Sequence, residues 1–225
     1  MQNEITKKEI IKEIDNHVSE ISKEFKKGFE LLKKYPKSVT IFGSSRINRD
    51  NQYYSKAQSL GEKIVKDLGY TIITGGGPGI MEASNKGAKN ANGNSIGINI
   101  ELPREQKINE YVTESVLLNY FFVRKPLMNF AAEAYIFFPG GFGTFDELFG
   151  ILTLLQTKKI PDVPIILFGK DFWSPFVELI KDQMLNKYKT IDSENINLFK
   201  ITDSEEDVIN IIKLAPVSNW WQNID

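Results

Sequence analysis

The sequence contains no cysteine and only one histidine, His17, among its 225 residues. The absence of cysteine excludes disulfides, thiolate metal ligands and a cysteine nucleophile, and a single histidine cannot build a multi-histidine metal site. His17 lies in an amphipathic stretch, where a lone histidine is expected to be a surface or packing residue. We therefore expect no metal and no cofactor, and chemistry that rests on carboxylates and cations.

An excess of positive charge is also lacking, since the Lys and Arg residues nearly balance the Asp and Glu residues and leave a net charge of −1. Binding to a nucleic-acid backbone needs clustered cations, so nucleic acid is not an expected partner. The first ten residues contain no apolar signal core, and no window approaches 18 uninterrupted apolar residues. The sequence thus predicts a cytoplasmic protein that does not bind membranes.

Short apolar runs alternate with helical patterns along most of the chain. The runs that are typical of buried strands are residues 39–42, 70–73, 95–100, 134–138 and 164–168. Apolar residues at helical spacing follow these runs, for example over residues 52–68. This alternation predicts an α/β fold with a doubly wound parallel sheet of the Rossmann-like type, in one nucleotide-binding catalytic domain that spans residues 36–225.

Residues 1–35 are predicted to form an N-terminal helical arm, which ends near Tyr35 because Pro36 follows. The apolar stripe of this helix consists of Ile11, Ile14, Val18, Ile21, Phe25 and Leu32. Such a stripe must be covered, either by its own domain or by another subunit. We expect the arm to lie across or beside a homodimer interface, outside the active site.

A glycine-rich turn over residues 138–144 joins a predicted strand to a predicted helix. Backbone N–H groups at the start of that helix, together with the positive end of its dipole, suit a phosphate. Thr144 adds a hydroxyl there, and Glu147 lies on the same side of the first turns. In the alternative interpretation, Thr144 and Glu147 form only a T-x-x-E capping box.

Two further loops follow predicted strands. Residues 74–82 contain Gly76, Gly77 and Gly79, and residues 43–46 contain Ser44, which we take as a candidate for phosphate or substrate binding. Neither glycine loop matches the P-loop or the dinucleotide fingerprint, so an NTPase or a dehydrogenase is not expected. Glycines could also simply allow a helix to pack tightly against the sheet. We favour a ligand that spans both glycine loops.

Adjacent cations, Arg124 and Lys125, lie within an aromatic and apolar run over residues 120–128. Cations in such surroundings usually meet an anion, although both side chains could instead extend to solvent from the start of a helix.

Taken together, residues 75–82 (GGGPGIME), Arg124-Lys125 and residues 139–147 (PGGFGTFDE) resemble the LONELY GUY (LOG) family, long misnamed lysine decarboxylases. The resemblance implies a Rossmann-like fold, a homodimer, and cleavage of nucleoside 5′-monophosphates to free base and ribose 5-phosphate. Plant members of the family activate cytokinins in this way. Nothing in the sequence matches a pyridoxal phosphate site, so decarboxylation is not expected.

The resemblance also implies roles for individual residues. Glu147 and Arg124 correspond to the catalytic pair of the family. Further residues implied in binding the phosphate or the rest of the substrate are Gly140, Gly141, Gly143, Thr144, Lys125, Glu105 and Thr153.

The expected activity is therefore hydrolysis of the N-glycosidic bond of AMP or of a cytokinin riboside 5′-monophosphate. The alternative is a non-catalytic protein that binds or carries a nucleotide or a phosphorylated cofactor. A pure binder needs the glycine loops and Thr144 but has no use for a paired carboxylate and arginine. The presence of both Glu147 and Arg124 favours the enzyme.

Overall fold

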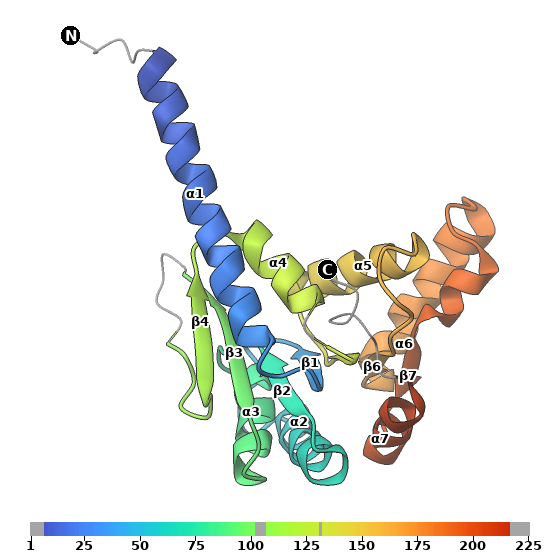
Figure 1. Cartoon of the computed structure of the whole chain (residues 1–225). Helices are drawn as coiled ribbons and strands as arrows, with labels where there is room; N and C mark the ends of the chain where they lie inside the picture. Colours follow the sequence, from blue (N-terminus) through green and yellow to red (C-terminus); the bar gives the residue numbers. More distant parts are fainter. Residues whose placement is uncertain (1–6, 102–106, 131, 217–225) are drawn as a thin grey trace.

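The computed structural model describes residues 7–101, 107–130 and 132–216. Within these residues the chain forms a parallel sheet of seven strands in the order β4-β3-β2-β1-β5-β6-β7, flanked by helices (Figure 1). The strands are β1 Ser38–Phe42, β2 Thr71–Thr74, β3 Ser95–Ile100, β4 Glu114–Leu118, β5 Ala134–Phe137, β6 Ile165–Phe168 and β7 Lys200–Thr202. The predicted doubly wound α/β fold is confirmed.

The central strands are buried at every position. In β1, β2, β5 and β6 each residue is buried, which explains why these strands contain no charged residues and show no regular alternation of apolar and polar residues. Strand β1 pairs in parallel with β2 on one side and with β5 on the other. The strand order therefore reverses between β1 and β5. In sheets of this kind the ligand crevice lies at that point, outside the carboxyl ends of the strands.

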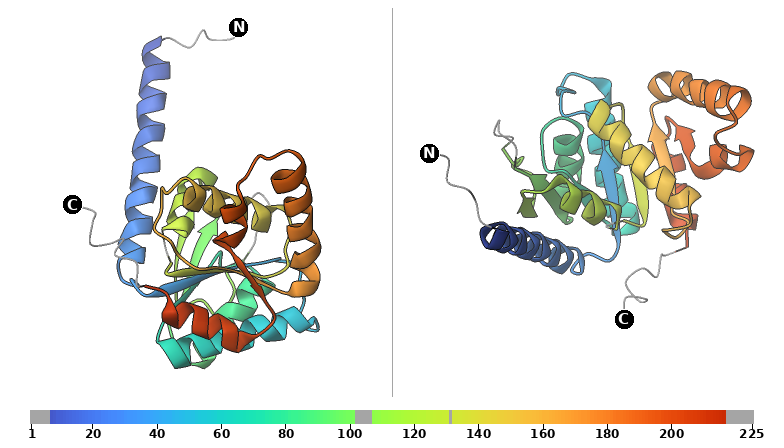
Figure 2. Two further views of the ribbon diagram at one scale, coloured as in Figure 1. Left: turned by 90° about the vertical axis from the view of Figure 1, so that its right-hand side faces the viewer. Right: turned by 90° about the horizontal axis from the view of Figure 1, so that it is seen from above.

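Helices cover both faces of the sheet (Figure 2). They are α1 Lys7–Leu32, α2 Gln52–Lys63, α3 Ile80–Asn90, α4 Phe121–Asn129, α5 Phe142–Gln156, α6 Lys170–Leu179 and α7 Glu205–Leu214. The helix predicted over residues 52–68 is continuous, but its last turn, Ile64–Leu68, is π-helical and ends at Gly69 with φ +68°. A second π-helical segment, Ile180–Lys187, extends α6, and a 3₁₀ helix, Ser193–Leu198, precedes β7.

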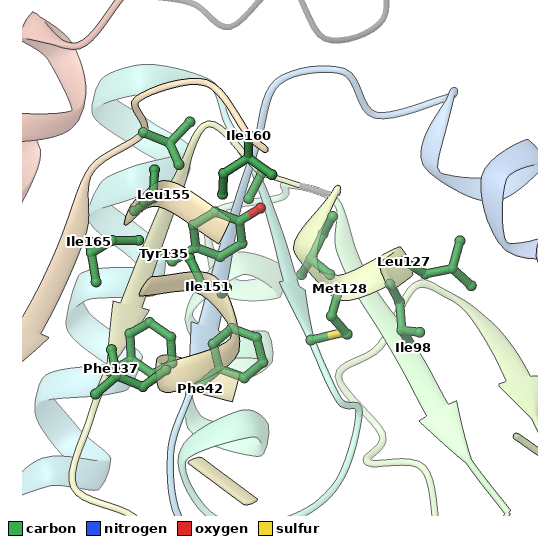
Figure 3. Close-up of a cluster of buried hydrophobic side chains, with 14 of the residues drawn as sticks. Phe42, Ile98, Leu127, Met128, Tyr135, Phe137, Ile151, Leu155, Ile160 and Ile165 are labelled. Carbon is green, nitrogen blue, oxygen red and sulfur yellow. The ribbon is translucent and has the colours of Figure 1, made fainter. Parts of the chain in front are cut away.

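Each face of the sheet has its own apolar core. Helices α2, α3 and α7 cover one of these cores, with residues such as Leu60, Ile80 and Val208. The other core lies beneath α4, α5 and α6, and Figure 3 shows part of it, where Phe42 and Phe137 point toward the same helix face. Their rings stack at 4.9 Å between centroids, beneath the cavity described below.

Helix α1 divides into two parts. Its last turn lies in the core, where Leu31 and Leu32 are buried and the helix ends three residues before Tyr35. Ile21 and Phe25 pack against that core, whereas Ile14 and Val18 are exposed, and the side chain of Ile11 lies outside the described residues. Figures 1 and 2 show this first part of α1 extending beyond the sheet. The predicted apolar stripe is therefore covered in cis only over its second half.

His17 belongs to the first part of α1, where its Nδ1 lies 3.3 Å from the Tyr120 hydroxyl at an exposed position. This is a surface contact. Across the described ranges, no helix is both long enough and apolar enough to cross a membrane.

Candidate functional site

A cavity of about 620 Å³ lies at the carboxyl ends of β1, β2 and β5, where the strand order reverses. Its walls come from the loop after β1, the start of α3, the start of α4 and the first turns of α5. The lining residues are Phe42, Gly43, Ser44, Ser45, Arg46, Gly75, Met81, Phe121, Arg124, Gly141, Phe142, Gly143, Thr144, Phe145, Asp146 and Glu147. Three separate predicted motifs thus meet in one cavity, as expected for the switch point of an α/β sheet.

The first turn of α5 faces this cavity. Gly141 is the N-cap residue and makes no side-chain capping hydrogen bond, so the N–H groups of the first turn are not capped by it. Because the helix begins at Phe142, Thr144 lies inside the helix and the capping-box interpretation of Thr144 and Glu147 is wrong. The uncapped N–H groups and the helix dipole together leave this end of α5 suited to an anion.

Glycine at position 140 allows the close approach of Thr144. A Cβ atom at Gly140 would collide with the Thr144 hydroxyl, so a larger residue would displace that side chain. Gly140 itself is outside the cavity lining, whereas Gly141, Gly143 and Thr144 line the cavity. Gly140 therefore contributes to the cavity indirectly, because it leaves room for the Thr144 side chain.

Arg124 and Glu147 lie together at the inner end of the cavity. The distance from Arg124 Nη1 to Glu147 Oε1 is 3.9 Å, and the side chains are only 15% and 9% exposed. Arg124 Nε donates a hydrogen bond of 2.9 Å to the Ile98 carbonyl, which fixes the guanidinium. Glu147 Oε2 is buried and has no hydrogen-bond partner in the described part of the chain. The carboxylate thus keeps the capacity to accept a hydrogen bond from a ligand.

Burial makes both charges of this pair costly. It raises the pKa of Glu147 from 4.5 to about 7, an effect that the charges of Arg124 and Lys125 oppose and that of Asp146 reinforces. Burial likewise lowers the pKa of Arg124, against the attraction of Glu147. Strongly perturbed groups in a cleft are more often functional than structural, because folding alone would favour apolar side chains there.

Only part of the glycine loop after β2 lines the cavity. Gly75 lines the cavity, and a Cβ atom there would collide with Arg124. Gly76 and Gly79 have φ values of +72° and +71°, and neither they nor Gly77 is a lining residue. A Cβ at Gly79 would collide with the backbone of Ser44, whose carbonyl accepts a hydrogen bond from the N–H of Ile80.

A partly buried polar network holds this glycine loop in place. Asn109 Nδ2 donates to the carbonyls of Gly76 and Gly77 at 3.1 and 2.9 Å, and to Asn85 Oδ1 at 3.0 Å. Gly76 and Gly79 therefore allow tight packing of this loop, and contact of Gly76, Gly77 and Gly79 with substrate stays a prediction.

The loop after β1 forms the wall opposite α5. Ser44 lines the cavity as predicted, and its Oγ accepts a hydrogen bond of 3.1 Å from the N–H of Arg46. The N–H of Ser44 donates to the Pro139 carbonyl, which ties this loop to the glycine-rich turn after β5. Arg46 also lines the cavity with an exposed side chain, but the sequence analysis did not include it among the site residues. The position of Arg46 directly after Ser44-Ser45 was the sequence feature that could have identified it as a site residue.

Other predicted contacts lie outside the cavity lining. Lys125 Nζ contacts Asp146 Oδ1 at 2.7 Å and the Asp146 carbonyl at 3.2 Å, so it links α4 to α5. Thr153 is exposed nearly two turns beyond Glu147 and donates to the Phe149 carbonyl. Glu105 lies outside the described residues. Substrate contact by Lys125, Thr153 or Glu105 therefore stays a prediction.

Comparison with proteins of known sequence places this site in a family. The family described as "Possible lysine decarboxylase" matches residues 81–212, which include Arg124 and the glycine-rich turn before α5. A cytokinin riboside 5′-monophosphate phosphoribohydrolase of Rhodococcoides fascians is 25% identical over 69% of this chain and 79% of its own length. The rice enzyme LOG, with the same activity in its name, is 27% identical over 79% of this chain and 74% of its own.

Solved structures with the same fold include molybdenum cofactor proteins. The molybdenum cofactor binding protein of Rippkaea orientalis is 25% identical, with a TM-score of 0.57 over 78% of this chain and 93% of that one. The molybdenum cofactor carrier protein of Chlamydomonas reinhardtii has a TM-score of 0.58 over 79% and 96%, but at 19% identity it shows the fold alone. The family match covers more than half of the chain and contains the cavity's charged pair, so this protein belongs to the lysine decarboxylase-like family, the LOG family that its glycine motifs predicted.

Proposed function

We propose that this protein hydrolyses the N-glycosidic bond of a nucleoside 5′-monophosphate, AMP or a cytokinin riboside 5′-monophosphate, to release the base and ribose 5-phosphate. The observation that carries this proposal is the buried Arg124–Glu147 pair, whose Glu147 Oε2 has no partner in the described residues. The names of the Rhodococcoides and rice relatives support the same reaction.

The phosphate would bind at the start of α5. The uncapped N–H groups of this turn, the Thr144 hydroxyl and the helix dipole converge on the cavity there. Because the phosphate is remote from the bond that breaks, its binding energy can hold the ribose in a reactive orientation. Nucleosides that lack the phosphate should therefore be poor substrates.

The pair then acts on the glycosidic bond. As the bond between C1′ and the base nitrogen breaks, positive charge grows on the ribose and negative charge on the base. An ionised Glu147 stabilises the ribosyl cation and orients the attacking water or the ribose hydroxyls, while Arg124 positions the substrate and stabilises the departing base. The water oxygen bonds to C1′ and a proton passes to the base, so the step needs no redox partner.

A second candidate is a binding or carrier protein for a phosphorylated cofactor. The likeness to the Rippkaea molybdenum cofactor binding protein favours it. A carrier would use the same anion site at α5, but it would have no need for two mutually compensating buried charges, whose desolvation is costly. The enzyme is therefore the better supported of the two.

The test is incubation of the full-length protein with a panel of nucleoside 5′-monophosphates, with free base and ribose 5-phosphate measured by chromatography. We expect release from AMP or an N6-modified AMP and little from adenosine. Equal rates on AMP and adenosine would contradict the role of the phosphate. Tight binding of nucleotides without release would support the carrier instead.

The remaining features of the proposal come from the sequence. We take residues 36–225 as the catalytic domain and residues 1–35 as an arm, and we expect a homodimer that works in the cytoplasm. The second half of α1 nevertheless belongs to the core of its own chain, through Leu31 and Leu32. Any contact of the arm with a second subunit would therefore involve its first half.

A further inference from the structure

Two phenylalanines stand exposed at the rim of the cavity. Phe142, the first residue of α5, is 97% exposed, and Phe121, the first residue of α4, is 61% exposed. Both are lining residues of the cavity. They begin the two helices that carry Glu147 and Arg124, so the rings and the charged pair are held by the same rigid elements. An aromatic side chain exposed to water at a cavity rim does not gain the free energy of burial. A ligand that covered the ring would supply that free energy.

The lining of the cavity divides into three parts. The loop after β1 and the start of α5 present hydroxyls and backbone N–H groups, and Arg124 with Glu147 forms the charged inner end. The apolar remainder comprises Phe42, Met81, Phe145 and the two rim phenylalanines. Phe42 stacks on Phe137, and Phe145 of α5 packs against aromatic rings of α6, so both rings already have aromatic partners within the chain.

We propose that Phe121 and Phe142 hold the planar base of the substrate and set the preference for the leaving group. The inference rests on the proposed function. With the phosphate at the start of α5 and the ribose C1′ at the Arg124–Glu147 pair, the apolar part of the lining is left for the base, and these two rings are its exposed members. Bases stack on aromatic side chains because both present flat, polarisable faces.

Calorimetry with AMP and ribose 5-phosphate tests this proposal. The full-length chain carrying Glu147→Gln is used so that AMP is not consumed, and ribose 5-phosphate serves as the ligand without a base. We expect Phe142→Ala and Phe121→Ala each to raise the dissociation constant of AMP about 10-fold and to leave that of ribose 5-phosphate within about twofold, since stacking on one ring is lost. Phe142→Tyr should retain the affinity for AMP.

Phe122→Ala is the matched control. Phe122 adjoins Phe121 on α4 and is exposed to a similar extent, but it is not a lining residue and packs near the Tyr120 ring. Its substitution should change neither dissociation constant. A loss of AMP affinity in this variant equal to that in Phe121→Ala would overturn the proposal, because the effect would then belong to the surface of α4 in general.

Other outcomes separate the failure of this proposal from failure of the function. If AMP and ribose 5-phosphate bind the starting protein equally well, the base makes no useful contact and the aromatic rim is excluded, while the phosphate site stands. If neither ligand binds, the proposed function itself fails. Light scattering tests one further outcome. If the Phe142→Ala variant dissociates an oligomer but binds AMP normally, the Phe142 ring is a contact between copies of the chain. That result would refute its role toward the base.

Discussion

Replacing Glu147 with glutamine should stabilise the protein at alkaline pH while it abolishes turnover. The carboxylate is almost completely buried, and its pKa is raised to about 7 although Arg124 is close by. The folded protein therefore binds a proton between pH 4.5 and about 7 that the unfolded chain has already released. In that window the stability of the wild-type protein falls as the pH rises, and above it the loss is complete.

The size of the effect follows from the same numbers. The difference between 4.5 and about 7 corresponds to about 3 kcal/mol, at about 1.4 kcal/mol per pKa unit, lost when Glu147 ionises in the folded state. Glutamine is nearly isosteric with the protonated side chain and does not titrate. The gain in unfolding free energy from Glu147→Gln should therefore be about 1 kcal/mol at pH 5 and reach about 3 kcal/mol at pH 8.

Urea denaturation between pH 5 and pH 8 would measure this gain. Trp173 is fully buried and its indole donates to the Phe137 carbonyl, so its fluorescence should follow unfolding of the core beneath the site. Glu20→Gln is the matched control, because Glu20 is an exposed carboxylate on α1 paired with Lys23. This control should show no gain that depends on pH.

A constant difference between wild type and Glu147→Gln at all pH values would refute the reasoning, since a buried ionisation must act through pH. A destabilisation at pH 8 would also refute it. That result would mean that the Arg124–Glu147 attraction outweighs the desolvation of the carboxylate, contrary to the raised pKa.

Three other predictions concern catalysis and assembly. The value of kcat/KM for AMP should rise with pH to a plateau, with a midpoint near the Glu147 pKa of about 7, because the ionised carboxylate is the active form; a flat profile from pH 5 to 8 would contradict this. Arg124→Lys should lower kcat about 100-fold in the same assay, since an ammonium cannot reproduce the planar guanidinium held in the site, and wild-type turnover would remove Arg124 from the mechanism. Deleting residues 1–20 should leave the melting temperature nearly unchanged but weaken the oligomer in light scattering, because Ile14 and Val18 are exposed in the single chain; an unchanged oligomer would assign the arm to another partner.

Much of the fold could be predicted because its signals are local. The runs at 39–42 and 134–138 are mostly apolar, which suits strands with both faces covered, and they pair as β1 and β5. Glycine after each run indicated where the chain turns into a helix. The motif around Glu147 is also a local signal. Thr144 and Glu147 are three residues apart, so a helix places them on the same side.

The direction of side chains and backbone groups could not be predicted from the sequence. A glycine motif does not say which of its glycines faces a ligand, and in the loop after β2 only Gly75 is among the lining residues, whereas Gly76 and Gly79 support the backbone. The start of α5 at Phe142, which excludes the capping box, depends on backbone angles at Gly141. Lys125 was paired with Arg124 in the prediction, yet its ammonium contacts Asp146.

The sequence by itself determined that this chain forms a parallel α/β sheet with glycine-rich turns, and its resemblance to a known family indicated Arg124 and Glu147 as candidate catalytic residues. Only the tertiary structure decided that these two side chains lie 3.9 Å apart in a buried site, that Phe121 and Phe142 share its rim, and that Ile14 and Val18 of α1 are left exposed. The physical reason is that strand and helix patterns arise from neighbours along the chain. Burial, and with it the pKa of Glu147, arises from the packing of segments that meet only when the sheet is complete.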